Sequence, residues 1–320
     1  MSRLTVYIIM ASIVVVNVAV FGFIFSKQSQ ALPTGVQSVD QGTTTKIVGE
    51  IFSGYDDPLG RPMDVTLNDE FMYVTDTNKR KVHVFDTDGE KLFAFGEPGS
   101  DPGQFDFPYG ISVADDGGIY VADMYNSQIS IFDKQGEFIE YFAREYSENG
   151  TIISPAGLRI IGEKVYVTDV DANKVFVFDL QGQLLLDIGE EGFDEGQFLA
   201  PNAVTADEEG NIYVVDTGNN RVQVFNSEGD FLRIFYAQEN ETNSILVNPR
   251  GIDIDSRGNV YVVSNMTNFI HKFDKEGNHL SRFGGMGQGI GELHLPNGLF
   301  IQKDNIYVTD TLNLRISVFQ

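Results

Sequence analysis

The stretch PYGISVADDGGIYVADMYNSQISIFDKQGEFIEYF, residues 108–142, decides the fold of this chain. Four short runs rich in β-branched and aromatic residues alternate with the turn-forming segments ADDGG, MYNSQ and KQGE, which predicts four antiparallel strands. Runs such as GIYVAD are too continuously apolar for a sheet with one wet face. They are typical of a sheet that is covered on both faces.

Six copies of this pattern, spaced 46 to 48 residues apart, fill the chain from about residue 58 to its end. Each copy starts at a proline, and the six are Pro62, Pro108, Pro155, Pro201, Pro249 and Pro296. A tyrosine follows each proline: Tyr73, Tyr120, Tyr166, Tyr213, Tyr261 and Tyr307. A phenylalanine comes next: Phe85, Phe132, Phe178, Phe225, Phe273 and Phe319. Such a period marks a repeat architecture whose units bury their apolar faces against one another.

Six four-stranded units predict an all-β fold, a six-bladed β-propeller. A solenoid is the structural alternative, but it needs polar caps at both ends. The last copy stops at Phe319-Gln320, where a third strand should end. The segment TKIVGEIF, residues 45–52, is similar to predicted outer strands such as KLFAF, residues 91–95. We therefore expect this N-terminal strand to complete the sixth blade and close the ring.

The repeats resemble those of the NHL family. The resemblance is clearest in IYVADMYNSQISIFD (119–133), IYVVDTGNNRVQVFN (212–226) and IYVTDTLNLRISVF (306–319). It implies a six-bladed propeller over residues 45–320. It does not identify the function, because such propellers serve as protein-binding platforms, RNA binders and sensor domains, and relatives are lyases. The chain departs from the pattern where Ser264 replaces the aspartate and where Lys174 and Phe269 replace the arginine.

The N-terminal segment predicts a membrane anchor. Residues 4–25 are almost continuously apolar, and at about 1.5 Å per residue they span roughly 33 Å, enough for a bilayer core. This length favours a transmembrane signal-anchor within residues 1–27, although Ser29-Gln30-Ala31 keeps a cleaved signal peptide open. Arg3 and the amino terminus outweigh Lys27, which orients the large domain out of the cytoplasm, to the periplasm or cell surface. Residues 28–43 read as a flexible linker, followed by the propeller at 44–320.

The charge of the chain excludes some partners. The net charge is -24, and because residues 1–27 contain Arg3 and Lys27 but no acid, the remainder carries -26. A surface this acidic repels phosphate backbones, so we expect no nucleic-acid partner. The chain has no cysteine, which excludes disulfides, a thiol nucleophile and thiolate metal ligands.

The two faces of the predicted propeller differ in their loops. Turns after the first and third strands are tight, whereas the loops between blades are long, as in GEPGSDPGQFDFP (96–108) and YAQENETNSILVNP (236–249). Long loops on a rigid ring are where recognition usually resides. The residues that follow the prolines, expected at the channel mouth on this face, are Met63, Tyr109, Ala156, Asn202, Arg250 and Asn297.

We expect ligand binding at four of these positions, Tyr109, Asn202, Arg250 and Asn297. Arg250 is a basic residue in a strongly acidic protein, and tyrosine and arginine are common binding anchors. The alternative is that Arg250 forms an ion pair with an acid of a neighbouring loop.

Other chemistry-bearing residues have structural explanations. An aspartate recurs where the second strand ends, at Asp76, Asp123, Asp169, Asp216 and Asp310, and we expect it to accept backbone hydrogen bonds. An apolar residue three before each proline is expected to fill the gap between blades. His83 and His271 are expected on the surface, and the inner strands offer only Asp64 and Asp253 as carboxylates. We therefore expect no catalytic set, no bound metal and no cofactor.

The leading hypothesis is a non-enzymatic, membrane-tethered protein that binds a protein or peptide through its long-loop face. A second is a metal-assisted lyase or hydrolase at the channel mouth, with Asn202, Asn297 and Asp253 as ligands. A third is a sensor in which Arg250 holds a small anion.

Overall fold

The structure is a computed structural model that describes residues 45–54, 57–235 and 244–320. The expected anchor and linker lie outside these residues. Within the described residues, no helix combines the length and the apolar character needed to cross a membrane.

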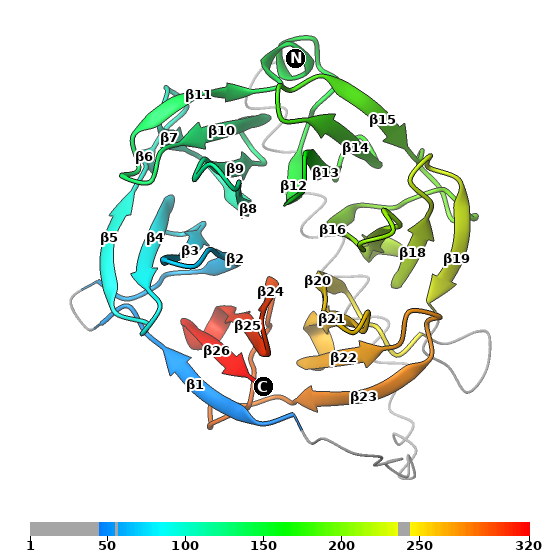
Figure 1. Cartoon of the computed structure of the whole chain (residues 1–320). Helices are drawn as coiled ribbons and strands as arrows, with labels where there is room; N and C mark the ends of the chain where they lie inside the picture. Colours follow the sequence, from blue (N-terminus) through cyan, green and yellow to red (C-terminus); the bar gives the residue numbers. More distant parts are fainter. Residues whose placement is uncertain (1–44, 55–56, 236–243) are drawn as a thin grey trace, which may run out of the picture. The chain divides into compact units, whose positions relative to one another are not determined.

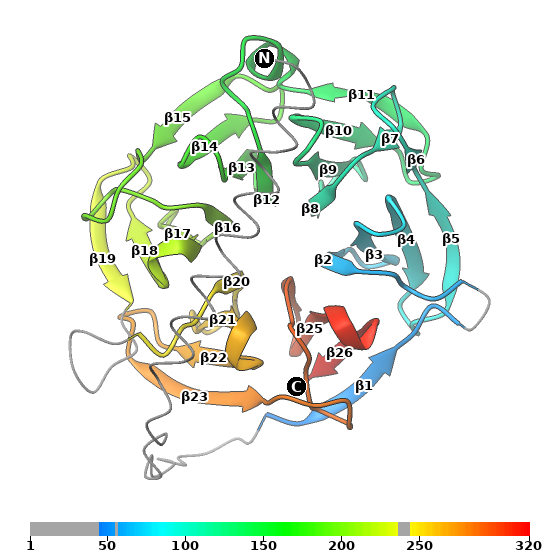
Figure 2. The same ribbon diagram turned by 180° about the vertical axis from the view of Figure 1, so that it is seen from behind.

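The described residues form a six-bladed β-propeller, in which each blade is a four-stranded sheet and the blades are arranged in a ring around a central axis (Figure 1, Figure 2). The inner strands are β2 (Pro62–Leu67), β8 (Pro108–Val113), β12 (Pro155–Ile161), β16 (Pro201–Ala206), β20 (Pro249–Ile254) and β24 (Leu299–Gln302). The second strands are β3 (Phe71–Asp76), β9 (Ile119–Asp123), β13 (Lys164–Asp169), β17 (Ile212–Asp216), β21 (Val260–Ser264) and β25 (Asn305–Asp310). The third strands are β4 (Lys81–Asp86), β10 (Gln128–Phe132), β14 (Lys174–Asp179), β18 (Arg221–Phe225), β22 (Phe269–Phe273) and β26 (Arg315–Phe319). The outer strands are β5 (Lys91–Phe95), β11 (Phe138–Phe142), β15 (Leu184–Ile188), β19 (Phe231–Phe235), β23 (His279–Gly284) and β1 (Ile47–Ile51).

Apolar side chains fill the space between neighbouring blades, as the sequence predicts. The residues three before the prolines are at most 1 % exposed, and they are Leu59, Phe105, Ile152, Phe198, Leu246 and Leu293. Phe105 packs on Phe132 at 5.4 Å between ring centroids, and Phe198 packs on Phe225 at 5.6 Å. Because each such residue precedes the inner strand of one blade, its burial fixes where the next blade begins.

The N-terminal strand closes the ring, which confirms the expectation from residues 45–52. β1 pairs antiparallel with β26 and supplies the fourth strand of the sixth blade. Lys46 and Gln320 exchange two backbone hydrogen bonds of 2.8 Å, and Arg315 in β26 forms a 2.7 Å ion pair with Glu50 in β1. A hydroxyl also crosses to the first blade, where Thr311 donates to the Pro62 carbonyl at 2.8 Å.

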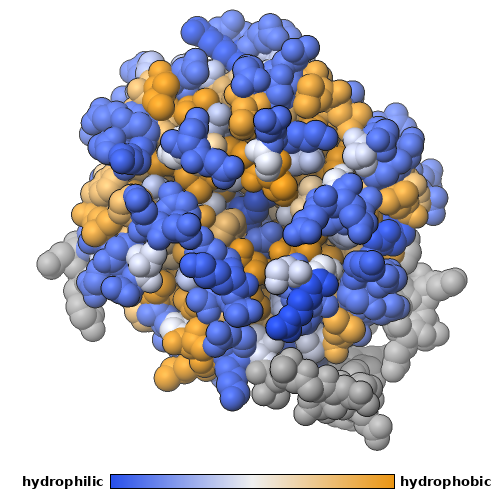
Figure 3. All heavy atoms as spheres, viewed as in Figure 1, coloured by the Kyte–Doolittle hydropathy of each residue, from blue (hydrophilic) through white to orange (hydrophobic). Residues whose placement is uncertain are grey.

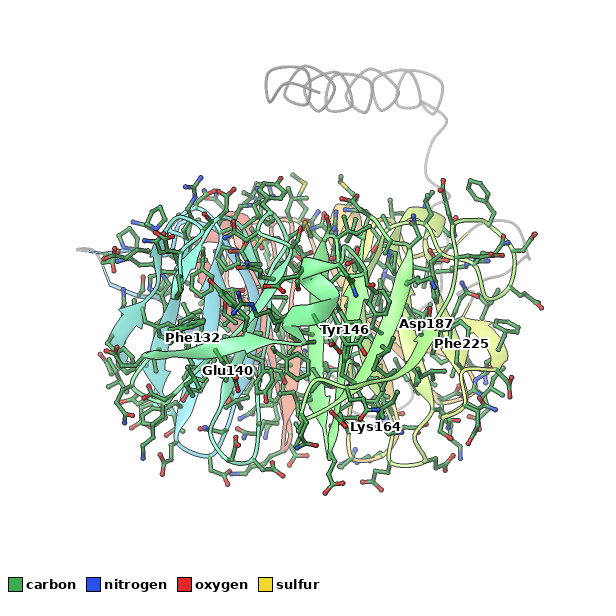
Figure 4. The ribbon with its side chains drawn as sticks, turned by 90° about the horizontal axis from the view of Figure 1, so that it is seen from above. Phe132, Glu140, Tyr146, Lys164, Asp187 and Phe225 are labelled. Carbon is green, nitrogen blue, oxygen red and sulfur yellow. The ribbon has the colours of Figure 1, made fainter. Side chains whose placement is uncertain are left out.

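The two faces of the ring carry different loops, as expected. The tight turns after first and third strands lie on the face seen in Figure 1, and the interblade loops and the loops after second strands lie on the face seen in Figure 2. Figure 4 shows the ring from the side, with Lys164 beside a tight turn and Tyr146 toward the opposite face. Tyr146 lies in the short helix α2 (Arg144–Glu148), and three-residue helices η1 (Thr217–Asn219), η2 (Asn265–Thr267) and η3 (Thr311–Asn313) follow second strands. The tight-turn face is mainly hydrophilic, with a hollow at its centre (Figure 3).

The expectation that His83 and His271 lie on the surface is wrong. Both side chains are buried, and so are the serine and glutamine residues that occupy the same place in other blades. The His83 ring lies 3.4 Å from the Asp76 carboxylate, and the His271 ring lies 3.2 Å from the ring of His279. Burial, aided by the nearby His279 and Arg282, lowers the pKa of His271 to about 3, so this ring is neutral. The third strand is therefore covered on both faces even where its sequence is polar.

Candidate functional site at the channel mouth and long-loop face

The four predicted binding residues line one cavity at the channel mouth. Three of them come directly after the proline that begins an inner strand, and these are Tyr109, Asn202 and Arg250. The fourth, Asn297, follows Pro296 just before β24. In the first five blades the strand pairing shifts directly after this position, as between Pro155 and Leu158. The cavity has a volume of about 20 Å³, enough for about one water molecule. The structure thus brings the four side chains together, while their role as ligand-binding residues stays a prediction.

Tyr109 bridges three blades across the channel. Its hydroxyl contacts Oδ1 of Asn202 in the fourth blade and lies 2.9 Å from Oδ1 of Asn297 in the sixth. Its ring packs with Met63 and Ala156 from the neighbouring blades. Burial raises the pKa of Tyr109, and the nearby Arg250 partly opposes that rise, so the phenol is neutral at physiological pH. A neutral phenol held by two amides makes a polar floor for the mouth.

Arg250 is half-buried beside this floor. It lines the same cavity, and its positive charge acts on the Tyr109 hydroxyl. No carboxylate of the described residues lies within 4.0 Å of its guanidinium group. The alternative that Arg250 pairs with a loop acid therefore finds no support among the described residues. Glu239 and Glu241, which precede Arg250 in the sequence, lie outside them.

The sequence interpretation missed Arg159, a buried arginine in β12. Its side chain reaches across the channel, where Nη2 donates to the Leu299 carbonyl at 2.5 Å and Nη1 lies 3.8 Å from the Asp64 carboxylate. Its guanidinium carbon lies 5.2 Å from the centroid of the Phe300 ring. A signal was available, because Arg159 is the fourth residue after its proline, where the other blades carry Thr66, Ser112, Thr205, Asp253 and Phe300.

The carboxylates of two acids, the buried Asp64 and the half-buried Asp253, lie near enough to Arg159 for its charge to act on them. Burial raises the pKa of Asp64 to about 6, while the charge of Arg159 and backbone N–H donors from Val65 and Ile111 act in the opposite direction. Burial also raises the pKa of Asp253, again opposed first by Arg159. Arg159 therefore compensates two acids that the channel would otherwise hold without a counter-charge.

The metal-binding hypothesis needs Asp253 next to Asn202 and Asn297, but the carboxylate and the two amides have different hydrogen-bond partners. Asp253 accepts hydrogen bonds from the Ile301 and Ile254 backbone and from Thr205, whereas the two amides meet at Tyr109. In the parts of the chain that the structure describes, no three His, Asp or Glu side chains are placed to hold a metal ion.

The recurring aspartates have the structural role that the sequence indicates. Asp123 accepts from the backbone of Asp106 and Phe107, and Asp169 accepts from that of Ile153 and Ser154. Each carboxylate thereby fixes the interblade loop just before the proline. In the fourth and sixth blades an arginine is added, as in the 2.7 Å pair between Arg221 and Asp216. These bonds hold the described segments just before the prolines in defined positions.

Exposed apolar side chains gather on the long-loop face. Among the described residues, none of the strongly exposed large apolar side chains lies in a tight turn, whereas many lie on loops of the opposite face. The latter are Phe52, Tyr125, Ile153, Phe193, Val247, Met266, Met286, Ile290, Leu312 and Leu314. The Tyr125 ring packs at a tilt on Phe107, with 4.5 Å between ring centroids, and Phe107 in turn stacks beside Tyr109. The apolar loops therefore reach the rim of the mouth.

Comparisons with known proteins agree with this architecture. The model described as NHL repeat matches residues 105–132, and a family described as 6-bladed beta-propeller matches residues 139–237. A search of curated proteins gives no match.

Among solved structures, a catalytically inactive virginiamycin B lyase from Staphylococcus aureus with quinupristin aligns with a TM-score of 0.61 and 14 % identity, over 87 % of this chain and 99 % of that one. An auxiliary nutrient binding protein from Bacteroides thetaiotaomicron aligns with a TM-score of 0.61 and 13 % identity, over 86 % and 76 %. A chain of a nidogen/laminin complex aligns with a TM-score of 0.56 and 17 % identity, over 70 % and 80 %. At these identities the likeness concerns the fold, which is shared by enzymes and binding proteins.

Proposed function

We propose that this chain, an NHL-type six-bladed β-propeller, is a non-enzymatic recognition protein that binds a protein or peptide through its long-loop face. The observation that carries the proposal is the uneven distribution of exposed apolar side chains, which crowd this face and are absent from the described tight turns. Clusters of exposed apolar residues with a polar centre are typical of interaction sites. The mouth residues supply such a centre.

The loops that carry these side chains are anchored for recognition. Asn126 donates to the Gly99 carbonyl at 2.9 Å and to Asp123 at 2.7 Å, which ties the loop after β9 to the loop before β8. Asn219 and Asn313 make the equivalent bonds in the fourth and sixth blades. A surface held in one arrangement before binding loses less conformational entropy when a partner docks.

The binding test compares two triple variants of the full-length protein. In Tyr125→Ser/Met266→Ser/Leu312→Ser, three exposed loop residues of the long-loop face lose their apolar surface. We expect a partner identified by crosslinking in membranes to bind this variant at least about tenfold more weakly, because truncated anchors commonly cost more than 1 kcal/mol. The measurement is titration of the purified partner.

The matched control is Leu92→Ser/Leu232→Ser/Leu280→Ser, which removes similarly exposed side chains from outer strands. It should retain the partner with the affinity of the unaltered protein. Equal losses in both triple variants, or none in the first, would contradict docking on the long-loop face.

We further propose that residues 4–25 anchor the protein in a membrane with the propeller outside the cytoplasm. The proposal rests on the length of the apolar segment and the positive charges before it. A reporter enzyme that is active only outside the cytoplasm, fused after Gln320, should be active in membranes. Activity of a reporter that works only in the cytoplasm would overturn the orientation, and release of the fusion into the soluble fraction would overturn the anchor.

A further inference from the structure

We propose that the channel mouth binds a carboxylate group, either the C-terminus of a peptide or a small organic acid. This inference rests on the proposed function, since it assigns the chemistry that the centre of the long-loop face recognises. It is carried by an excess of hydrogen-bond donors over acceptors around the cavity.

The two asparagine amides leave donors without protein acceptors. Tyr109 has a single O–H, so it can donate to Oδ1 of Asn202 or of Asn297, but not to both. Turning one amide lets its Nδ2 donate to the phenol oxygen, and oxygen and nitrogen of an amide are assigned by such bonding. In either arrangement, the two amides carry N–H donors that find no other acceptor among the described residues. All three side chains are buried and line the cavity, so we infer that the free donors are available to a group bound there.

The arginines add further donors and positive charge. Arg250 lines the cavity, and Arg61, an exposed residue just before Pro62, lies close enough for its charge to lower the pKa of the Tyr109 phenol. Deeper in the same cavity, Nε of Arg159 is buried and has no hydrogen-bond partner among the described residues. The carboxylates that face this group are Asp64 and Asp253, and Arg159 lies between them. Arg250 and Arg61 thus remain as positive charge at the mouth of a protein whose net charge is -24.

The size and the surroundings of the cavity restrict the ligand. A volume of about 20 Å³ has room for about one water-sized group, so a ligand can place an oxygen of its head group there while the rest of the molecule stays outside. A planar carboxylate can accept from a guanidinium group and from amides at the same time. The Phe107 ring borders Tyr109 and packs on Tyr125, and these two rings offer an apolar surface to the atoms next to the carboxylate. The favoured ligand is therefore a carboxylate attached to an apolar group.

The test uses matched acid and amide probes on the full-length protein in detergent. The small probes are phenylacetate and phenylacetamide, and the peptide probes are N-acetyl-glycyl-phenylalanine and its C-terminal amide. Binding is followed by the melting temperature, at ionic strength balanced with chloride, and by NMR of the side-chain amides of Asn202 and Asn297. We expect both acids to bind in the millimolar range or tighter and both amides to bind at least about tenfold more weakly. Whichever acid binds more tightly, the peptide acid or the small free acid, then identifies the ligand class.

Arg250→Gln should weaken the acids about tenfold or more and leave the amides unchanged. The control is Arg257→Gln, which removes the same charge from an exposed tight-turn position of the same blade and should leave all four affinities unchanged. Arg250→Lys tests folding and geometry together, because it keeps the charge but loses the planar fork and should bind the acids with intermediate affinity.

Equal binding of acids and amides, absence of acid binding, or acid binding that is unchanged in Arg250→Gln would overturn the inference. These outcomes are distinct from failure of the proposed function, which is decided by partner binding to the apolar triple variants. One pattern of results would support the docking face and contradict the carboxylate assignment. In it, the Tyr125→Ser/Met266→Ser/Leu312→Ser variant loses the partner. The unaltered protein binds the partner equally well when the partner's C-terminus is amidated and when acid competitors are added.

Discussion

Deletion of residues 44–53 is expected to lower the melting temperature of the propeller by on the order of 10 °C. The deletion removes β1, so β26 loses its outer neighbour and becomes an open edge beside the fifth blade. It also removes the contacts of Ile47 and Ile51 with the clusters on either side of the sixth blade. Arg315, which is almost fully buried, loses its ion pair with Glu50. Together these losses amount to several kcal/mol of unfolding free energy.

The measurement is thermal unfolding with hydrodynamic radius as a second readout. An equally long deletion of residues 30–39, which precedes the propeller, serves as the control and should leave the melting temperature unchanged. If both deletion variants had the melting temperature of the unaltered protein, the stability of the ring would not depend on β1. An exposed β26 edge should also promote self-association in the first variant, because unpaired strand edges pair with other chains.

Arg159→Gln is expected to lower the unfolding free energy by about 3–5 kcal/mol near neutral pH. The substitution removes the cation that most opposes the raised pKa of both Asp64 and Asp253, and leaves the buried Asp64 and the half-buried Asp253 without it. It also removes the donor to the Leu299 carbonyl in the sixth blade. Urea unfolding at constant temperature measures the loss. Arg250→Gln is the control, since it removes the same charge at the mouth and should cost far less.

The size of this loss should depend on pH. The folded-state pKa of Asp64, about 6, lies above its ordinary value of 3.8, so its ionisation destabilises the fold as pH rises between these values. Without Arg159 the carboxylates hold their protons to still higher pH. The difference between variant and unaltered protein should therefore be largest above pH 6, and smaller at about pH 5, where Asp64 is largely protonated in both. A difference that stayed constant across this range would show that Arg159 acts through packing alone.

The repeat made the fold predictable from sequence. Pro62 and its five equivalents set the start of every inner strand, and the unfinished last copy indicated that residues 45–52 would pair with the chain end. The channel mouth was predictable for the same reason, since Tyr109, Asn202 and Asn297 occupy one position of the repeat and the ring brings that position together.

The features that could not be predicted from the sequence depend on packing between blades. Position within the repeat does not say how far a long side chain reaches, so the bridge from Arg159 to the sixth blade was missed. Polar residues of the third strands, such as Gln223, suggested an exposed face that would also hold His83. In the structure Gln223 is buried and bonds to Asp216 and the Gln197 carbonyl, because the interblade loop that leads into its own blade covers it.

The pairing of Lys46 with Gln320 has a consequence for the connectivity of the chain. The gap in the covalent chain falls where five other blades have a tight turn between the third and outer strands, so the blades form a cycle with no first or last member. Joining these ends and opening another such turn would give a circular permutant with the same ring. The new N-terminus could then lie at any of the six blades, and in each case it would fall at the same kind of turn between a third and an outer strand.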